Sequence, residues 1–273
     1  MTARTPRLKW HMLRRRKSDP AFLRANLRAA LAARAACEVD LVLTRDGHAL
    51  CLHDLTLDAE TTGSGPVAAA TRAQVERLRQ RAPDGTPLAE PPLFLDEVVD
   101  IVRASGVRVP ALVQLDVKVP REALDAAAAR RIGDTLGRDA ALFVAGGCDW
   151  DAIRDLAEAA AGLAAGYDPL GTYPRGFDLD DAGFRSLGER TYATAPDAAI
   201  FYLEASLLLA GLARGVNVVP FVTRNGAMVD AWTVDADRPG LASVLARLVA
   251  AGCGQITSND PDLLAPLLAE AAA

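Results

Sequence analysis

Short apolar segments alternate with helical segments along almost the whole chain, and this alternation constrains the fold more than any other feature. Alternating strands and helices are typical of a parallel sheet, because a parallel strand needs a crossover connection that is usually a helix. The expected strands cover residues 8–11, 37–43, 109–117, 141–145, 163–167, 198–203 and 255–258. The expected helices cover residues 20–35, 71–81, 95–105, 121–136, 150–161, 178–187, 205–213, 241–251 and 260–271.

About eight strand–helix pairs fit this pattern, which favours a (β/α)8 barrel formed as a single domain over residues 1–273. A doubly wound open sheet is the alternative, although its nucleotide-binding versions are disfavoured because no glycine-rich phosphate motif follows the first strand. Residues 216–222 and 228–234 are both apolar and flank Asn225-Gly226, which predicts a hairpin. Periodicity does not decide which of these two runs is the barrel strand.

Composition sets the broad class. The 273 residues are 51% hydrophobic with a net charge of −5, so the core is sizeable and nucleic acid is not expected as a partner. No apolar run is long enough to span a bilayer, and basic residues 1–17 lack the apolar core of a secretory signal. The four cysteines lack CxxC spacing, which predicts reduced, buried side chains in a cytoplasmic protein.

Glu38 and Asp40 lie two residues apart on an apolar strand, and His53 follows a short distance along the chain. Residues two apart on a strand point to the same face, so the two carboxylates are expected side by side. Such a pair is costly to bury unless water or a cation satisfies it. The arrangement suits a hard divalent cation and leaves an imidazole for proton transfer. An exposed edge strand with solvated acids is the alternative.

Other polar residues are expected at the carboxyl ends of strands, where barrel enzymes place their catalytic groups. His11 ends the first strand, Asp116 and Lys118 form a second pair two residues apart, and Trp232 lies near the end of a late strand. Each has an ordinary structural role as an alternative: a surface histidine, a solvated lysine or a core tryptophan. Their shared placement at strand ends favours a joint functional role.

A series of short motifs then follows the order of a known family. They are His11-Met12-Leu13, Cys37-Glu38-Val39-Asp40, Thr44-Arg45-Asp46-Gly47, the stretch from His53-Asp54 to Thr61-Thr62-Gly63-Ser64-Gly65, Asp116-Val117-Lys118, Trp232-Thr233-Val234-Asp235 and Ser258-Asn259-Asp260-Pro261. In these motifs the chain resembles the glycerophosphodiester phosphodiesterases.

The resemblance implies a (β/α)8 barrel with a small insertion after the second strand, at about residues 54–92. It also implies Mg²⁺ or Ca²⁺ held by Glu38, Asp40 and Asp116, with His11 and His53 as an acid/base pair and Lys118 on the phosphate. The implied reaction is metal-dependent hydrolysis of small glycerophosphodiesters to glycerol 3-phosphate and an alcohol.

The chain departs from the family pattern at several positions, among them Asp19-Pro20-Ala21-Phe22, which stands where the family usually has Pro-Glu-Asn-Thr. Met12 and Leu13 replace the usual Arg-Gly, and Asp116 stands where the family usually has Glu. His-Met and Asp-x-Lys resemble instead the spider-toxin phospholipase D branch of the same superfamily, so a lysophospholipase D-like activity on lysolipids is one alternative. A non-catalytic barrel is another.

The basic run from Arg14 to Lys17 follows the first expected strand directly. It could replace the missing family arginine at the substrate, and alternation along an extended segment would place Arg15 on the His11 side. Weak contact with anionic lipid headgroups is a second role for this run, and a solvated loop is a third. Arg15 is therefore a candidate substrate-binding residue. It joins Lys118 and the strand-end residue Trp232 in that predicted role.

Overall fold

Eight parallel strands close into a barrel in the computed structural model, which describes residues 5–272. The strands are β1 (Arg7–Trp10), β2 (Ala36–Leu43), β4 (Val113–Val117), β5 (Phe143–Gly147), β6 (Ala164–Tyr167), β7 (Ile200–Glu204), β8 (Met228–Trp232) and β9 (Gln255–Ser258). β1 pairs with both β9 and β2, and this second pairing closes the sheet. The (β/α)8 prediction is confirmed, and the open doubly wound sheet is excluded.

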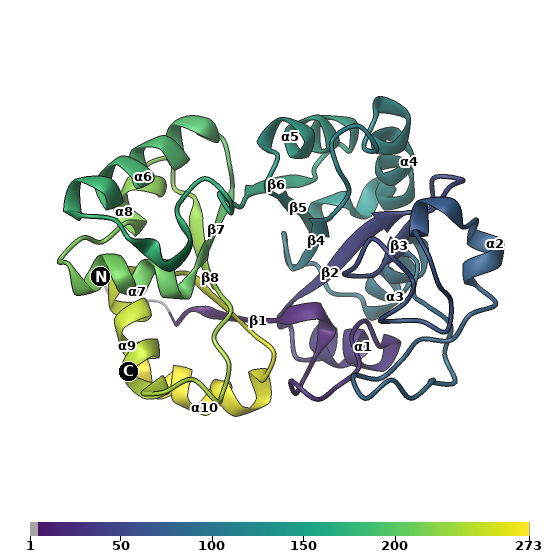
Figure 1. The fold of residues 1–273 in the computed structure, drawn as a ribbon, viewed down its shortest axis with the longest axis horizontal. Coiled ribbons are helices and arrows are strands. Elements are labelled where there is room, and N and C mark those ends of the chain that lie inside the picture. Colours follow the sequence, from purple (N-terminus) through teal and green to yellow (C-terminus); the bar gives the residue numbers. More distant parts are fainter. Residues whose placement is uncertain (1–4, 273) are drawn as a thin grey trace.

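Helices surround the strands as an outer ring (Figure 1). They are α1 (Arg24–Ala32), α3 (Leu95–Ser105), α4 (Ala126–Leu136), α5 (Trp150–Ala159), α6 (Asp181–Thr194), α7 (Ala205–Ala213), the short α8 (Val219–Val222), α9 (Leu241–Ala251) and α10 (Pro261–Ala271). Three of them begin at an aspartate whose side chain accepts hydrogen bonds from the first turn, namely Asp125, Asp149 and Asp180. Such caps satisfy amides that have no partner within the helix.

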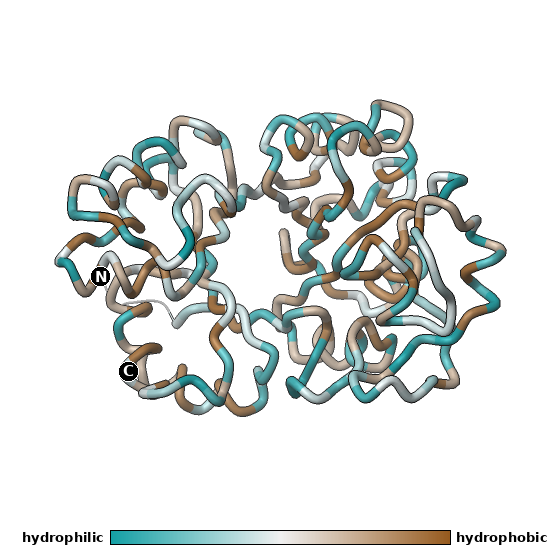
Figure 2. The backbone as a smooth tube through the Cα atoms, in the orientation of Figure 1, coloured by the Kyte–Doolittle hydropathy of each residue, from teal (hydrophilic) through white to brown (hydrophobic). Residues whose placement is uncertain are grey.

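The main core lies between the outer face of the barrel and the helices. On β2, Val39 and Leu41 point outward into this core, while Glu38 and Asp40 point to the barrel interior. Figure 2 shows hydrophobic colouring along the strands and mostly hydrophilic colouring on the outer turns. One face of each strand thus stabilises the barrel, and the other carries polar groups into its interior.

An insertion follows β2, as the family resemblance implied. The strand β3 (Ala49–Cys51) pairs antiparallel with β2, and residues 52–94 then form loops with a 3-10 turn (Val67–Ala69) and the short helix α2 (Arg72–Val75). These loops close over a small apolar cluster of their own that includes Leu52, Leu57 and Phe94. The insertion, which lies beside the barrel in Figure 1, therefore packs around a small core that it shares with Val42 of β2.

Three local predictions are wrong. The first helix begins at Arg24 instead of Pro20, and the helix expected over 71–81 ends at Val75. The hairpin around Asn225-Gly226 does not form, because residues 219–222 are helical and only 228–232 join the sheet. Asn225 instead donates through Nδ2 to the carbonyl oxygens of Pro196 and Ala198, which fixes this turn against the loop before β7.

Among residues 5–272, no helix is both long and apolar enough to cross a membrane. Residues 1–4, part of the basic segment considered above, lie outside the described residues.

Candidate functional site

Polar side chains from several strands meet in one cavity at the carboxyl ends of the barrel. The cavity has a volume of about 270 Å³. Six of the predicted site residues line it: His11, Glu38, His53, Asp116, Lys118 and Trp232. Asp40 lies beside Asp116 in the strand register, and its side chain is fully buried. The barrel thus brings together groups that are up to 221 positions apart in the chain, from His11 to Trp232.

Glu38, Asp40 and Asp116 form a compact acidic cluster. One oxygen from each lies within 4.8 Å of the others. Neither oxygen of Asp40 accepts a hydrogen bond within the described part of the chain, although Lys118 Nζ lies 3.3 Å from Oδ1 as an ion pair. Burial raises the pKa of Asp40 well above its ordinary value, and the nearby carboxylates add to this while Lys118 opposes it. Three converging carboxylates, with both oxygens of Asp40 free of hydrogen bonds from the described residues, fit a hard divalent cation.

Lys118 carries a positive charge to the edge of this cluster. Its Nζ contacts Asp116 and lies near Asp40. Burial alone would lower the pKa of Lys118, but attraction to the carboxylates outweighs burial and raises it. The ammonium therefore stays charged at neutral pH and is available to an anionic substrate.

His11 is held by a chain of side chains from the far end of the sequence. Its Nδ1 lies 2.8 Å from Asn259 Oδ1, and its Nε2 lies 3.6 Å from Glu38 Oε1. Asn259 in turn donates through Nδ2 to the carboxylate of Asp235 at 3.1 Å and 3.2 Å, which orients its amide. Because the amide oxygen only accepts, Nδ1 must carry a proton and Nε2 is left for acid/base chemistry.

His53 reaches the cavity from the insertion and is half exposed. Its Nδ1 lies 2.9 Å from Asp54 Oδ1. The backbone amides of His53 and Asp54 both donate to Glu60 Oε2, at 2.8 Å and 3.1 Å. Glu60, part of the predicted motif stretch, therefore fixes the loop that carries the second histidine.

Lys9 is a site residue that the sequence analysis missed. Its buried Nζ lies 2.9 Å from Glu38 Oε2 and 2.7 Å from Asp230 Oδ2, and it also contacts Gln114. Burial would lower the pKa of Lys9, but the two carboxylates raise it overall. Burial would likewise raise the pKa of Glu38, yet Lys9, with His11 and Lys118, lowers it to about 2. Lys9 thus keeps Glu38 ionised.

Polar residues spaced two apart are the sequence signal that could have found this network. Lys9 precedes His11 by two positions, Gln114 precedes Asp116, and Asp230 precedes Trp232. Asp230 also accepts hydrogen bonds from Thr257 Oγ1 at 2.7 Å and Gln255 Nε2 at 2.8 Å. The same inward-facing periodicity therefore recurs on at least four strands, of which the sequence analysis used two.

The basic run does not place its side chains by strand alternation. Met12 and Leu13 both have positive φ (51° and 57°), so the chain turns directly after His11. Arg15 pairs with Asp262 at 2.9 Å, and neither Arg14 nor Arg15 lines the cavity. Arg14 Nη1 instead lies 3.4 Å from Asn259 Oδ1, the atom that also faces His11. The turn therefore brings Arg14, and not Arg15, toward the histidine.

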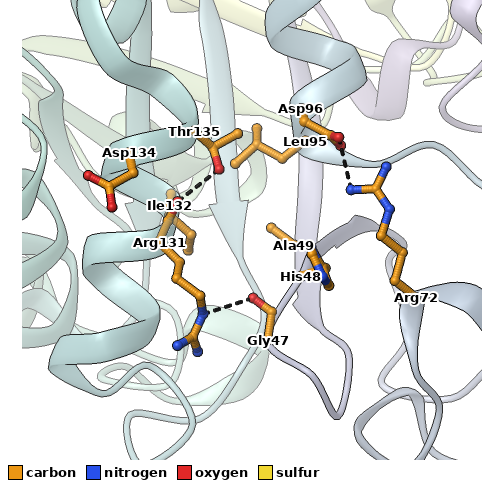
Figure 3. A pocket seen from close by; sticks show the side chains of 10 residues that line it. All are labelled: Gly47, His48, Ala49, Arg72, Leu95, Asp96, Arg131, Ile132, Asp134 and Thr135. Carbon is orange, nitrogen blue, oxygen red and sulfur yellow. Dashed lines mark hydrogen bonds and ion pairs between the residues drawn. The ribbon is translucent and has the colours of Figure 1, made fainter.

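A second cavity lies between the β2–β3 turn and α4 (Figure 3) and shares no lining residue with the first. Its arginines are engaged within the protein. Arg72 Nη1 donates to Asp96 at 2.8 Å, and Arg131 Nε donates to the Gly47 carbonyl at 3.3 Å. His48 is exposed at its edge and forms no part of the acidic site.

Comparisons with known proteins identify the family of this chain. The family model "Glycerophosphoryl diester phosphodiesterase family" matches residues 25–263. "Probable glycerophosphodiester phosphodiesterase 1" of Mycobacterium tuberculosis is 42% identical over 71 residues, and the match covers 24% of this chain. The matched segment spans 26% of that curated relative's length.

Solved structures are similar over nearly their whole length. A phosphodiesterase from Oleispira antarctica, in complex with the product sn-glycerol-3-phosphate, has a TM-score of 0.69 at 17% identity, with 97% of each chain covered. A glycerophosphodiester phosphodiesterase from Parabacteroides distasonis has a TM-score of 0.70 at 15% identity, covering 98% of this chain and 99% of that one. At these identities the likeness concerns the fold.

The fold and the site define a (β/α)8 barrel protein with an acidic cluster, a lysine and two histidines at the carboxyl ends of its strands. The chain belongs to the glycerophosphoryl diester phosphodiesterase family.

Proposed function

We propose that this protein hydrolyses small glycerophosphodiesters to glycerol 3-phosphate and an alcohol, with Mg²⁺ or Ca²⁺ as cofactor. One observation carries the proposal: the carboxylates of Glu38 and Asp116, beside Asp40, line the same cavity as His11, His53 and Lys118. Hydrolysis of a phosphodiester requires neutralisation of the negative charge on the non-bridging phosphate oxygens. It also requires removal of a proton from the attacking oxygen and addition of a proton to the bridging oxygen that leaves. The family assignment and the product complex of the Oleispira antarctica protein support this reading.

Glu38, Asp40 and Asp116 would hold the cation, which when bound supplies positive charge to a phosphate oxygen. Lys118 adds a second, compact charge for the same phosphate. His11 and His53 divide the proton transfers: one accepts a proton from the nucleophile, and the other protonates the departing alkoxide, which is a poor leaving group unless protonated. Trp232 supplies an apolar wall to the cavity.

Two nucleophiles fit this arrangement. Water gives glycerol 3-phosphate directly, whereas attack by the 2-hydroxyl of the substrate's own glycerol gives a cyclic phosphate first. Phosphorus NMR during the reaction separates the two routes, because only the second accumulates a cyclic species.

The test of the proposed function is an assay of purified protein with a panel of glycerophosphodiesters in Mg²⁺, Ca²⁺ or EDTA. We expect release of glycerol 3-phosphate that depends on the cation and is abolished by EDTA. Absence of hydrolysis with every substrate and both cations would instead favour the non-catalytic barrel. Activity that persists in EDTA after removal of bound metal would contradict the cation's role.

A lysophospholipase D-like activity is the second candidate. Leu170, a large hydrophobic residue that is 45% exposed, lines the cavity and could contact an acyl chain. Lysolipid substrates in the same panel test this activity, and vesicle sedimentation at low and high salt tests weak lipid contact by the basic run. Cys37, Cys51 and Cys253 are buried as predicted, whereas Cys148 is exposed, contrary to the prediction that all four cysteines are buried. All four are free of disulfide bonds, which supports a proposed cytoplasmic location.

A further inference from the structure

Lys9 binds one of the two carboxylate oxygens of Glu38 from inside the barrel. Its Nζ lies 2.9 Å from Oε2, whereas Oε1 faces His11 Nε2 at 3.6 Å. Within residues 5–272, these are the two ion pairs that Glu38 forms. Oε1 is therefore the oxygen of Glu38 that is available to a cation, because Oε2 is already bound by a protein ammonium.

The ammonium of Lys9 is fixed by further contacts and cannot leave Glu38 when a cation arrives. Its Nζ also lies 2.7 Å from Asp230 Oδ2 and contacts Gln114, and its side chain is 2% exposed. Asp230 is itself held by the hydroxyl of Thr257, which donates to Oδ1 at 2.7 Å. Lys118, in contrast, is 28% exposed and can swing toward solvent. The contact between Lys9 and Glu38 is thus permanent, whereas the contacts of Lys118 can exchange.

Tyr202 covers a further side of the Lys9 ammonium. Nζ lies 4.7 Å from the centroid of the Tyr202 ring, which is buried. The ring packs against Gly146 of β5 and Gly166 of β6, where an added Cβ would lie 2.8 Å and 2.6 Å from Tyr202 Cε2. Glycine at these two positions gives the ring its space. The ammonium is therefore held between an aromatic face and two carboxylates.

The number of oxygens that a carboxylate offers distinguishes Ca²⁺ from Mg²⁺. Ca²⁺ takes about six to eight oxygen ligands and commonly binds both oxygens of one carboxylate. Mg²⁺ is smaller, requires near-octahedral geometry and keeps several waters beside one or two carboxylates. Because Lys9 leaves only one oxygen of Glu38 available, the site suits Mg²⁺ and deprives Ca²⁺ of a ligand.

We propose that Lys9 is a metal-selectivity residue: by holding Oε2 of Glu38, it limits this carboxylate to one ligand oxygen and makes the site prefer Mg²⁺ to Ca²⁺. This inference rests on the proposed function and names the cation that the site takes. Lys9 acts through Glu38 and touches neither the cation nor the substrate, so it is a positioning residue.

The test measures the dissociation constants of Mg²⁺ and Ca²⁺ by isothermal titration calorimetry of the purified protein. We expect the parent to bind Mg²⁺ more tightly than Ca²⁺. Lys9→Met should lower the ratio of the Ca²⁺ constant to the Mg²⁺ constant about tenfold, because groups that orient a metal ligand change affinity by about this factor. Loss of the lysine charge strengthens the binding of both divalent cations alike, so the ratio isolates the effect of the freed oxygen.

Lys17→Met is the matched control, because Lys17 pairs with Asp235 and Asp237 at the surface. This variant should keep the parent ratio. A double variant, Lys9→Met with Asp230→Asn, keeps the test available if Lys9→Met does not fold. It removes the buried ammonium together with the second carboxylate that this ammonium neutralises, so less uncompensated charge remains in the barrel.

Infrared difference spectra on addition of Ca²⁺ give a readout that does not depend on affinity. The antisymmetric and symmetric carboxylate stretches move closer together when a carboxylate binds a cation through both oxygens. We expect one more such bidentate carboxylate in the Lys9 variants than in the parent.

An unchanged ratio in every Lys9 variant that folds, or a parent that binds Ca²⁺ more tightly than Mg²⁺, would overturn the selectivity role while leaving the proposed function intact. Identical infrared spectra of the parent and the variants would likewise contradict it. A parent that binds neither cation would instead overturn the metal dependence of the proposed function.

Discussion

The ammonium of Lys9 lies 2.9 Å from Oε2 of Glu38, and the other oxygen of Glu38, Oε1, faces His11 Nε2 at 3.6 Å. Lys9 therefore uses one oxygen of this carboxylate and leaves the second for the cavity. A buried lysine with two carboxylate partners also fixes the side chain of Glu38 in one position. The contact with Lys9 inside the barrel thus determines which oxygen of Glu38 is available for chemistry.

Removing this lysine should destabilise the protein strongly. Lys9→Met leaves Glu38 and Asp230 buried without their counter-charge, which costs about 3–5 kcal/mol of unfolding free energy. Urea unfolding at pH 7 measures the loss. Lys17→Met is the control, because Lys17 pairs with Asp235 and Asp237 at the surface, and its midpoint should match the parent. Equal midpoints for the Lys9 variant and the parent would show that the network contributes nothing.

Asp40→Asn should affect the Tm differently in the absence and in the presence of a divalent cation. In metal-free protein the substitution removes a buried negative charge between Glu38 and Asp116, so we expect a Tm equal to or above that of the parent. The rise in Tm on adding Mg²⁺ or Ca²⁺ should be lost, because a ligand stabilises only the state that binds it. Differential scanning fluorimetry measures the Tm and its rise with cation. Asp134→Asn, which changes an exposed acid on α4, is the control. A full cation-induced shift in the Asp40 variant would contradict the metal site.

The two cavity histidines should act as one unit. Each of His11→Ala and His53→Ala should remove most of kcat, and the double variant should lose only about threefold more, because groups in one proton relay are not additive. The third histidine, His48, is exposed on the β2–β3 turn outside the site cavity, so His48→Ala should retain parent kcat. Near-normal turnover of His53→Ala would show that the acid/base pair is wrongly assigned.

Charge reversal separates the two arginines after His11. Arg14 Nη1 reaches Asn259 beside His11, so Arg14→Glu should raise KM for a phosphodiester far more than it lowers kcat. Arg15 pairs with Asp262 outside the cavity, and Arg15→Glu should keep the parent KM. Steady-state kinetics distinguishes them. If only Arg15→Glu raised KM, Arg15 would be the substrate contact, as strand alternation predicted, and the contact inferred for Arg14 would be wrong.

The pKa of Asp168 predicts a pH dependence of stability. Burial raises the folded-state pKa of Asp168, which lines the site cavity, to about 8, which is above the ordinary value for aspartate. At pH values between the ordinary pKa and 8, the folded protein therefore holds one proton more than the unfolded chain at this residue. The contribution of this group to stability therefore falls as pH rises from 5 to 8. In the presence of EDTA, Asp168→Asn should gain about 1–3 kcal/mol relative to the parent over that range, by urea unfolding. A constant difference across the range would rule out the shift.

The sequence alone determined the barrel and the chemical inventory of the site. Regular alternation of apolar runs and helices requires parallel pairing, and residues spaced two apart on a strand must share a face. For this reason Glu38 and Asp40, and the strand-end residues His11, Asp116 and Lys118, could be named before any coordinates. These arguments depend only on neighbours along the chain.

Only the tertiary structure decided which distant groups meet and how charge is shared among them. Lys9, Asp230 and Gln114 form one network because three strands converge inside the barrel. The positive φ of Met12 and Leu13 turns the chain so that Arg14, and not Arg15, approaches Asn259 beside His11. In the run at 216–222, residues 219–222 form a short helix, although the apolar pattern of the run also fitted a strand. Periodicity records which face a residue occupies, whereas contacts across the barrel depend on strand order, turn geometry and the packing that closes the sheet.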